Sequence, residues 1–406
     1  MVGAPADLSA RPALGPRRHR EAVAATREAM TEVLGRWGRG VTAAPEFDAV
    51  IAHARATYAE FVGVTAADVA IGHQVSPLVA LIAAFLPPGA EVLVPDGEFI
   101  SVTFPFAVQP ELRVRQVPLA DLADQITGDT SLVALAAVQS AGGQVADLDA
   151  LELAAARHDA DILLDLTQAT GWLPVDASRF AYTVCGTYKW LLSPRGTAFL
   201  TVRGDRLEAI LPAQANWYAG AQPWDSIYGL PLRLAPDARR FDVSPGWFSW
   251  VGTAASLDFL AGIGAEALHA HAIEVEAAFA DAAGLAAVGR AIVSLDADEQ
   301  TPRTPGPRRH HGKRARRPTA ARLPCQQHDR GGGRRRRAAT RARPALIRSR
   351  RAAGSPWWPR RARRGPRPRQ WCPRGRWGRP GSGIPGLASA SARSSYRRPL
   401  RVPGPR

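Results

Sequence analysis

The chain begins with two segments in which apolar residues recur every three or four positions. The first repeat comprises Val23, Met30, Val33, Leu34 and Trp37, and the second comprises Phe47, Val50, Ile51, Ala54, Tyr58, Phe61 and Val62. This spacing places the apolar side chains on one face of a helix. The pattern therefore predicts two amphipathic helices at the start of the fold.

Further along, the pattern changes to short apolar runs separated by longer, more polar segments. The runs are 92–94, 112–117, 131–138, 161–166, 182–185 and 197–202. Apolar runs of this kind are typical of strands buried on both faces, and most of the intervening segments are long enough for a crossover helix. We therefore predict an α/β fold with a mostly parallel central sheet flanked by helices.

The later part of the chain is organised differently. Residues 205–250 are rich in Trp, Pro and Gly, which indicates ordered loops over a site, and helices are expected at about 253–260 and 266–279. The predicted organisation is an N-terminal helical segment (1–44), a large domain (45–252), the start of a small domain (253–300) and a tail (301–406).

The whole chain has a formal net charge of +16 at pH 7, and its composition sets the tail apart from the rest. Residues 1–300 contain 20 Lys and Arg against 35 Asp and Glu, a net charge of −15, whereas residues 301–406 contain 32 against one, a net charge of +31. The tail is rich in Arg, Pro and Gly and has few apolar residues to bury, so we expect it to be disordered.

Two origins of this tail are open. A solvated basic segment would bind nucleic acid non-specifically through its arginines. Alternatively, the tail is the product of a frameshift, because Arg, Pro, Gly and Ala all have GC-rich codons. Nothing after residue 300 has the apolar pattern of a packed small domain, so the C-terminal small domain is expected to be missing or disordered.

Cysteine usage and the apolar stretches indicate the compartment. Cys185, Cys325 and Cys372 form no close pair, which fits neither a disulfide framework nor a zinc site. The first ten residues lack the apolar core of a signal peptide, and the longest apolar stretch, 78–86, is too short to span a membrane. We therefore expect a cytoplasmic protein with no metal site and no membrane partner.

Lys189 is the only lysine among residues 1–300, where 19 arginines carry the remaining positive charge. It lies in the apolar segment 188–192. Arginine stays protonated, whereas a desolvated lysine can lose its proton and form a Schiff base with an aldehyde. The lysine therefore predicts a pyridoxal phosphate site. The structural alternative is a lysine whose aliphatic stem covers the edge of the core.

Other segments meet the further demands of this cofactor. Asp165 ends a predicted strand, and its carboxylate can keep the pyridine nitrogen protonated. The segment 72–77 offers a glycine, Ser76 as a helix N-cap and Pro77 at the first helical position, so its amides can bind a phosphate. Phe99 can stack on the ring. Each has a structural alternative: a helix cap for Asp165, any capped helix for 72–77, and core packing for Phe99.

Two longer motifs resemble the class V aminotransferase family of fold type I pyridoxal-phosphate enzymes, which includes cysteine desulfurases, kynureninase and isopenicillin N epimerase-like proteins. The motifs are Asp165-Leu-Thr-Gln168-Ala-Thr-Gly171-Trp-Leu-Pro174-Val-Asp176 and Tyr188-Lys189-Trp-Leu-Leu-Ser-Pro194-Arg-Gly196. The resemblance covers about residues 15–295. It implies the fold type I architecture, pyridoxal phosphate as cofactor and an amino acid as substrate.

The resemblance also implies a role for the residues around the cofactor ring. Lys189 would form the internal Schiff base and, once freed by the substrate amine, would remove the Cα proton. Asp165 would pair with the pyridine nitrogen, and Gln168 would hydrogen-bond the ring oxygen. Phe99 would stack on the ring where desulfurases carry His.

A second group of residues would bind the cofactor's phosphate. The amides of Gln74 and Val75 would hold it, with Ser76 at the same helix start and the hydroxyl of Tyr188. Thr253 would reach the phosphate of a neighbouring subunit, which implies a homodimer. The position of Thr253 also suits a plain helix N-cap.

Departures from the family pattern bear on function. Tyr188 precedes the lysine, as in kynureninase-like members, and no cysteine lies in a recognisable desulfurase loop, so a persulfide-forming desulfurase is disfavoured. The preferred hypothesis is an aminotransferase or a Cβ lyase, with racemisation also open. The alternatives are a cofactor-binding but inactive product and a protein that binds nucleic acid through its tail.

Overall fold

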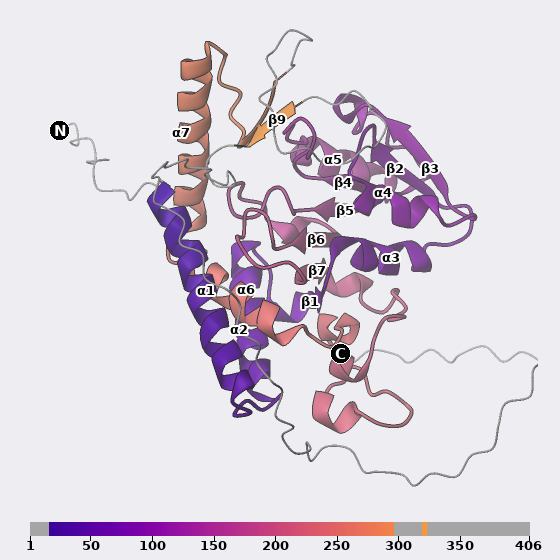
Figure 1. Ribbon diagram of the computed structural model, residues 1–406. Coiled ribbons are helices and arrows are strands. Elements are labelled where there is room, and N and C mark those ends of the chain that lie inside the picture. Colours follow the sequence, from indigo (N-terminus) through magenta and orange to yellow (C-terminus); the bar gives the residue numbers. More distant parts are fainter. Residues whose placement is uncertain (1–15, 296–318, 323–406) are drawn as a thin grey trace, which may run out of the picture. The chain divides into compact units, whose positions relative to one another are not determined.

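A seven-stranded sheet forms the centre of the computed structural model, which describes residues 16–295 and 319–322 (Figure 1). Its strands are β1 (Val69–Gly72), β2 (Glu91–Pro95), β3 (Arg113–Val117), β4 (Thr130–Ala136), β5 (Asp161–Asp165), β6 (Tyr182–Gly186) and β7 (Ala198–Val202). They lie in the order β1-β7-β6-β5-β4-β2-β3. The strands from β2 to β6 pair in parallel, whereas β7 is antiparallel to both of its neighbours. The prediction of a mostly parallel sheet is confirmed.

Each of the six predicted runs forms a strand, but the sequence pattern did not identify β1. This strand contains only four residues and follows closely after a helix. A run this short cannot be separated by its periodicity from the end of a neighbouring helix. The structure therefore adds an edge strand, paired antiparallel with β7, next to the segment 72–77.

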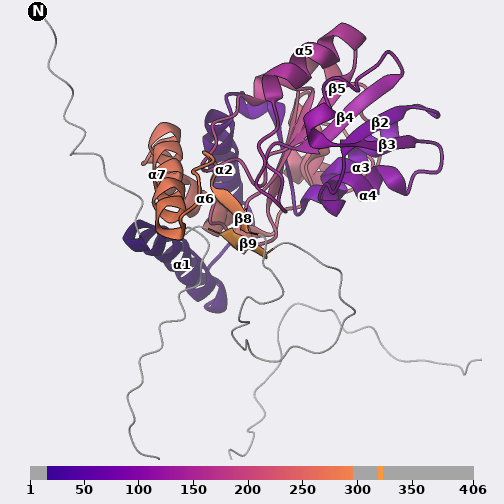
Figure 2. The ribbon, with the colours of Figure 1, turned by 90° about the horizontal axis from the view of Figure 1, so that it is seen from above.

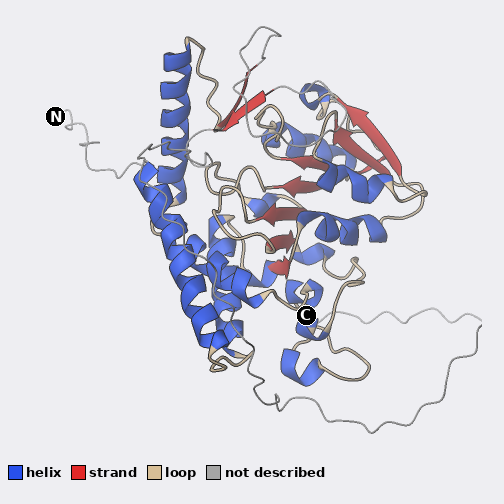
Figure 3. Ribbon diagram, viewed as in Figure 1, coloured by secondary structure: helices blue, strands red, loops and turns tan. Residues whose placement is uncertain are grey.

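Helices cover both faces of the sheet (Figures 1 and 3). They are α1 (Pro16–Gly38), α2 (Glu46–Phe61), α3 (Val75–Phe85), α4 (Ile100–Ala107), α5 (Leu148–His158), α6 (Trp247–Ala261) and α7 (Ala265–Ala283). One face packs against α3 and α4, and the other packs against α2, α5 and α6, with α1 lying against α6. Residues 203–246 form loops with short 3-10 turns, as the composition predicts.

Burial on both faces explains why the strands other than the edge strand β3 have no polar alternation. In β5, Leu163 packs into the core that contains α3 and α4, while Ile162 and Leu164 pack into the core on the opposite face. Outside the edge strand β3, charged side chains in the sheet are confined to strand ends, at Glu91 of β2 and at Asp161 and Asp165 of β5. This restriction places the candidate chemistry at one edge of the sheet.

The helix α6 begins earlier than the sequence predicts. It runs from Trp247, and the predicted domain boundary between residues 252 and 253 therefore falls inside it. Of the described helices, none alone is long and apolar enough to cross a membrane. Helices α6 and α7 reach that length and composition only as a pair, bent by 81°.

Of the predicted tail, the structure describes only β9 (Thr319–Arg322), which pairs antiparallel with β8 (Ile292–Leu295) (Figure 2). For these four residues the expectation of disorder does not hold, because strand pairing engages their backbone groups. The rest of 301–406 lies outside the described residues, as do the predictions of nucleic-acid binding and of a missing small domain.

A buried ion pair fixes the edge strand β1. Arg55 of α2 donates to Asp242 with an Nη2–Oδ2 distance of 2.6 Å, and their side chains are 7% and 1% exposed. Arg55 also donates to the carbonyl of Val69, and Asp242 accepts from the amide of Ile71 at 2.8 Å. The pair thus binds backbone groups of β1 directly upstream of the segment 72–77.

We expect Arg55→Met to lower the free energy of unfolding by about 3–5 kcal/mol, because it leaves the Asp242 carboxylate buried without its cation. Urea denaturation measures this loss. The matched control is Arg27→Met, since Arg27 pairs with Glu28 where both side chains are 71% exposed. The control should change stability by less than about 0.5 kcal/mol. Equal losses in the two variants would contradict the structural role of the buried pair.

Candidate active site

A cavity of about 310 Å³ lies where the parallel strands end. Eight of the predicted site residues line it: Gln74, Val75, Ser76, Phe99, Asp165, Gln168, Tyr188 and Lys189. Its size is within the range of small-molecule pockets, roughly 300–1,000 Å³. The topology explains the grouping, because loops after β1, β2, β5 and β6 meet at the same sheet edge.

The start of α3 forms one end of this cavity. The helix begins at Val75 with Gln74 as its N-cap, so the prediction of Ser76 as the N-cap is wrong by two residues. Proline is tolerated anywhere in the first turn, where amides have no intrahelical acceptor, and Pro77 therefore did not define the start. The Gln74 side chain makes no capping bond. The first-turn amides lie beside the cavity, where they suit an anionic group.

Asp165 ends β5 as a buried carboxyl that is 4% exposed. Its Oδ1 accepts a hydrogen bond of 2.8 Å from the amide of Thr167, whose hydroxyl in turn accepts from the amide of Gly186 at 2.9 Å. Burial raises the pKa of Asp165 to about 6, against the opposing effect of the Thr167 hydrogen bonds. A cationic N–H at this position would favour the ionised form.

Gln168 provides a test of whether the cavity suits pyridoxal phosphate. The side chain is 3% exposed, and its Oε1 accepts from the indole Nε1 of Trp190 at 3.2 Å. Its Nε2 has no hydrogen-bond partner in the described part of the chain. A buried donor left unpaired costs about 1–3 kcal/mol, so an acceptor on a ligand is expected beside it. The ring oxygen of the cofactor is such an acceptor, and the residues therefore fit the cofactor.

Phe99 and Lys189 approach each other across the cavity, with the lysine Nζ 5.5 Å from the centroid of the phenyl ring. Phe99 is 41% exposed, so the alternative of core packing does not hold. Buried Glu98 anchors the loop that carries the ring. Its Oε2 accepts from the amide of Ala136 at 2.8 Å and from the Gln139 Nε2 at 2.7 Å.

Thr253 is the predicted site residue that this structure does not bring to the cavity. It lies inside α6 with no exposed surface, and the N-cap of α6 is Gly246, so the alternative of a helix N-cap is wrong. Its predicted reach to the phosphate of a neighbouring subunit stays a prediction. Its hydroxyl donates to the carbonyl of Ser249 at 2.9 Å and lies 2.9 Å from the hydroxyl of Thr197. Thr197 lines the cavity, and Thr253 therefore supports the wall from behind.

Several residues lie in or beside the segments that the sequence singles out, but their roles around the cavity have no signal in the pattern. Thr167, Glu98 and Trp190 act on neighbouring site residues through hydrogen bonds that depend on tertiary distances. Arg195 also lines the cavity, and its guanidinium carbon lies 4.1 Å from the centroid of the Tyr188 ring. The Pro-x-Gly motif includes Arg195, but only the structure shows that its side chain reaches the cavity.

Cys185 has the properties of a core residue. It lies in β6 and is 1% exposed, as the sequence predicts for a buried strand. Burial raises the pKa of its thiol to about 12, which leaves almost no thiolate at neutral pH. Cys325 and Cys372 lie outside the described residues. Among residues 16–295 and 319–322, no cluster of His, Cys, Asp and Glu suits a metal ion.

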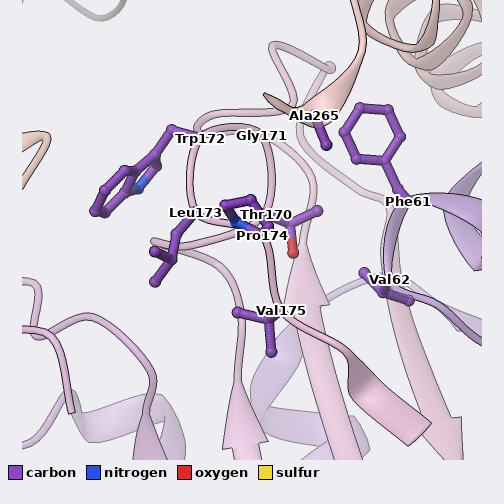
Figure 4. A pocket seen from close by; sticks show the side chains of 9 residues that line it. All are labelled: Phe61, Val62, Thr170, Gly171, Trp172, Leu173, Pro174, Val175 and Ala265. Atoms are coloured by element: carbon purple, nitrogen blue, oxygen red, sulfur yellow. The ribbon is translucent and has the colours of Figure 1, made fainter. Parts of the chain in front are cut away.

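A second pocket, between the 170–175 loop and the end of α2, has a volume of only about 10 Å³ (Figure 4). Phe61 and Val62 face this loop, while the side chain of Trp172 points away from Phe61. A space of this size holds a single water molecule at most. The small pocket is therefore a packing defect behind the Asp165 loop, not a site for a cofactor.

The fold and the site have counterparts among known proteins. The chain belongs to the aminotransferase class-V family, whose sequence profile matches residues 16–301. This membership confirms the resemblance predicted from the two motifs and, with it, pyridoxal phosphate as the cofactor. The sheet order and the helices on both faces agree with the fold type I architecture.

Individual relatives are distant. An uncharacterized aminotransferase of Bacillus subtilis (strain 168) is 28% identical over 230 residues, which are 54% of this chain and 60% of the relative. A kynureninase of Deinococcus radiodurans is 27% identical over 268 residues, covering 63% of this chain and 64% of the relative. The chain therefore spans about three fifths of the length of these curated relatives.

Among solved structures, the fold is similar to that of the cystine C–S lyase C-DES in complex with its reaction product, cysteine persulfide. The TM-score is 0.61 at 23% sequence identity, with 68% of this chain and 81% of the other covered. Similarity at this level of identity concerns the fold alone.

The raised pKa of Asp165 predicts a pH-dependent effect of Asp165→Asn in the protein without added cofactor. Because the native pKa of about 6 exceeds the ordinary value of 3.8, ionisation opposes folding, and wild-type stability falls as pH rises through this window. Asparagine cannot ionise. Relative to wild type, the variant should therefore gain up to roughly 3 kcal/mol on going from below pH 4 to above pH 6.

Urea denaturation at both ends of this pH window measures the change. Asp205→Asn is the control, because a hydrogen bond from Arg203 lowers the pKa of Asp205 and the sign should reverse. A difference between wild type and Asp165→Asn that does not vary with pH would contradict the prediction.

Proposed function

We propose that the protein is a pyridoxal-phosphate-dependent enzyme, an aminotransferase or a Cβ lyase, that acts on an amino acid. The observation that carries this proposal is the cavity itself, where Lys189, Asp165 and Gln168 meet and the Gln168 Nε2 donor has no partner in the described structure. The family to which the chain belongs supports the reaction class. The inert environment of Cys185 disfavours persulfide formation on that residue.

The residues around the ring have distinct tasks in this proposal. When bound, pyridoxal phosphate supplies an electron sink for the charge that develops at the substrate's Cα. Lys189 would hold the cofactor through its amine and, once free, would remove the substrate's Cα proton as a general base. Asp165 would hold a proton at the pyridine nitrogen, and Phe99 would cover one face of the ring.

The polar end of the cavity would bind the anionic groups. The amides of Val75 and Ser76 at the start of α3 and the Tyr188 hydroxyl suit the cofactor's phosphate. Arg195 lies over Tyr188 and adds a guanidinium that pairs well with a phosphate or a carboxylate. These groups suit a substrate that is an amino acid, because its carboxylate would be attracted to the polar end of the cavity.

The central prediction concerns Lys189. Wild-type protein incubated with pyridoxal phosphate and reduced with borohydride should carry the cofactor covalently on the peptide that contains Lys189. Lys189→Arg keeps the positive charge but has no amine to react, so it should retain neither the visible absorbance nor the covalent label. Absorbance spectra and peptide mass spectrometry measure both outcomes.

The same preparation distinguishes catalysis from binding. A change of the visible spectrum on addition of amino acids, absent in Lys189→Arg, supports catalysis, whereas an unchanging spectrum supports the alternative of a cofactor-binding but inactive protein. A wild-type protein that takes up no cofactor colour would overturn the proposal.

We further propose that the protein forms a homodimer. The exposed side of α4 and its C-cap carries an apolar stripe at a spacing of four residues, with Ile100, Phe104 and Val108 being 64%, 56% and 51% exposed. The stripe begins next to Phe99 at the cavity. An exposed apolar face of this kind is typical of a surface that another protein covers.

Charge placed on the stripe should therefore separate the subunits. We expect sedimentation equilibrium to give a dimer for the wild type and a monomer for Phe104→Glu, because a carboxylate in an apolar interface loses its hydration. Leu211→Glu is the control, since Leu211 is 69% exposed and belongs to the 203–246 loops. A wild-type protein that remains monomeric at all concentrations would contradict the proposal.

A further inference from the structure

Two tryptophans hold Gln168 by different atoms. The indole Nε1 of Trp172 donates to the backbone carbonyl of Gln168 at 2.6 Å, and the indole Nε1 of Trp190 donates to its side-chain Oε1 at 3.2 Å. The two indoles are 2% and 5% exposed, and their ring centroids lie 6.1 Å apart. The backbone and the side chain of Gln168 are therefore fixed separately.

The chemistry of the indole determines which way the Gln168 amide faces. An indole N–H is a donor only, so it can bond the oxygen of a carboxamide but not its NH₂ group. With Oε1 engaged by Trp190, the Nε2 group must face another direction. Gln168 lines the cavity, and Nε2 is the atom that lacks a partner in the described structure. Trp190 thus holds the acceptor end of the amide and leaves its donor end, which is buried, for another acceptor.

Close packing keeps Trp190 in this position. Gly171 has a φ of +109°, and a Cβ atom added there would lie 2.9 Å from the carbonyl oxygen of Trp190 and 3.0 Å from its Cβ. Only glycine allows the loop after β5 to approach the Lys189 segment this closely. The donor and acceptor of the Trp190–Gln168 bond consequently lie on two loops that are in close contact at Gly171.

We infer that Trp190 is a positioning residue that fixes the Gln168 amide so that its NH₂ group donates to the anionic ring oxygen of the cofactor. This inference rests on the proposed function. A fixed donor stabilises the ionised oxygen. Without Trp190 the amide can rotate and offer its oxygen instead, which favours the form of the cofactor that carries the extra proton.

The test uses the pH dependence of the visible absorbance of the full-length protein loaded with pyridoxal phosphate, with no substrate present. Trp190→Phe removes the N–H donor but keeps an aromatic ring, and it should raise the pKa of the bound chromophore by up to about one unit. In Trp190→His, the ring Nε2 lies as many bonds from the backbone as the indole Nε1. This variant should therefore keep the pKa close to that of the wild type, and it preserves the test if Trp190→Phe does not fold.

Two further variants separate the hydrogen bond from general damage. Trp250 is fully buried, and its Nε1 has no partner in the described structure, so Trp250→Phe should lower stability without moving the chromophore pKa. In a Gln168→Ala background, Trp190→Phe should cause no additional shift, because the residue through which it acts is gone.

The outcomes distinguish the inference from the function on which it rests. If the wild type binds the cofactor but Trp190→Phe and Trp190→His have the same chromophore pKa, the inference alone is overturned. A pKa shift caused by Trp190→Phe that persists in the Gln168→Ala background overturns it too. A wild type that binds no cofactor overturns the proposed function and this inference together.

Discussion

The common direction of the parallel strands is the constraint on which the rest of the structure depends. Helices cover both faces of the sheet, so a charged side chain on an inner strand can avoid burial in an apolar core only at a strand end. Because β2 to β6 run the same way, their carboxyl ends meet at one edge. Asp165, Phe99 and Lys189 are far apart in sequence, yet each lies at or shortly after the end of a strand at this edge.

The site combines deep burial with incomplete pairing. The carboxyl of Asp165 and the amide of Gln168 are almost wholly enclosed. Burial raises the pKa of Asp165, and the Nε2 donor of Gln168 has no acceptor in the described structure. In a purely structural core both conditions would lower stability without compensation. Their occurrence beside a cavity indicates groups that are held ready for a ligand, as enzymes of this family require.

Much of this arrangement follows from local sequence. The apolar runs predict every strand from β2 to β7, and a single lysine in an arginine-rich chain identifies Lys189. Strand ends then identify Asp165 and Phe99, because their position requires no knowledge of tertiary distances. The resemblance adds Gln168 and Tyr188, whose roles depend on which residues lie next to them in space.

The remaining features depend on contacts that no local pattern contains. Burial of Thr253 results from the packing of α6 against the loop that ends at Thr197. The true start of α3 depends on backbone angles, which a proline in the first turn does not specify. The bond between Trp190 and Gln168 joins two loops. These loops can approach each other closely because position 171 is a glycine, where a Cβ atom would clash with Trp190.

The rarity of lysine has a practical consequence. Amine-directed reagents usually modify many surface sites, but the first 300 residues of this chain offer one ε-amine, and it lies in the cavity. The rate of acylation or reductive alkylation of Lys189 would therefore show whether the cavity is occupied. Protection from the reagent would report directly on any molecule that fills the space between Phe99 and Asp165.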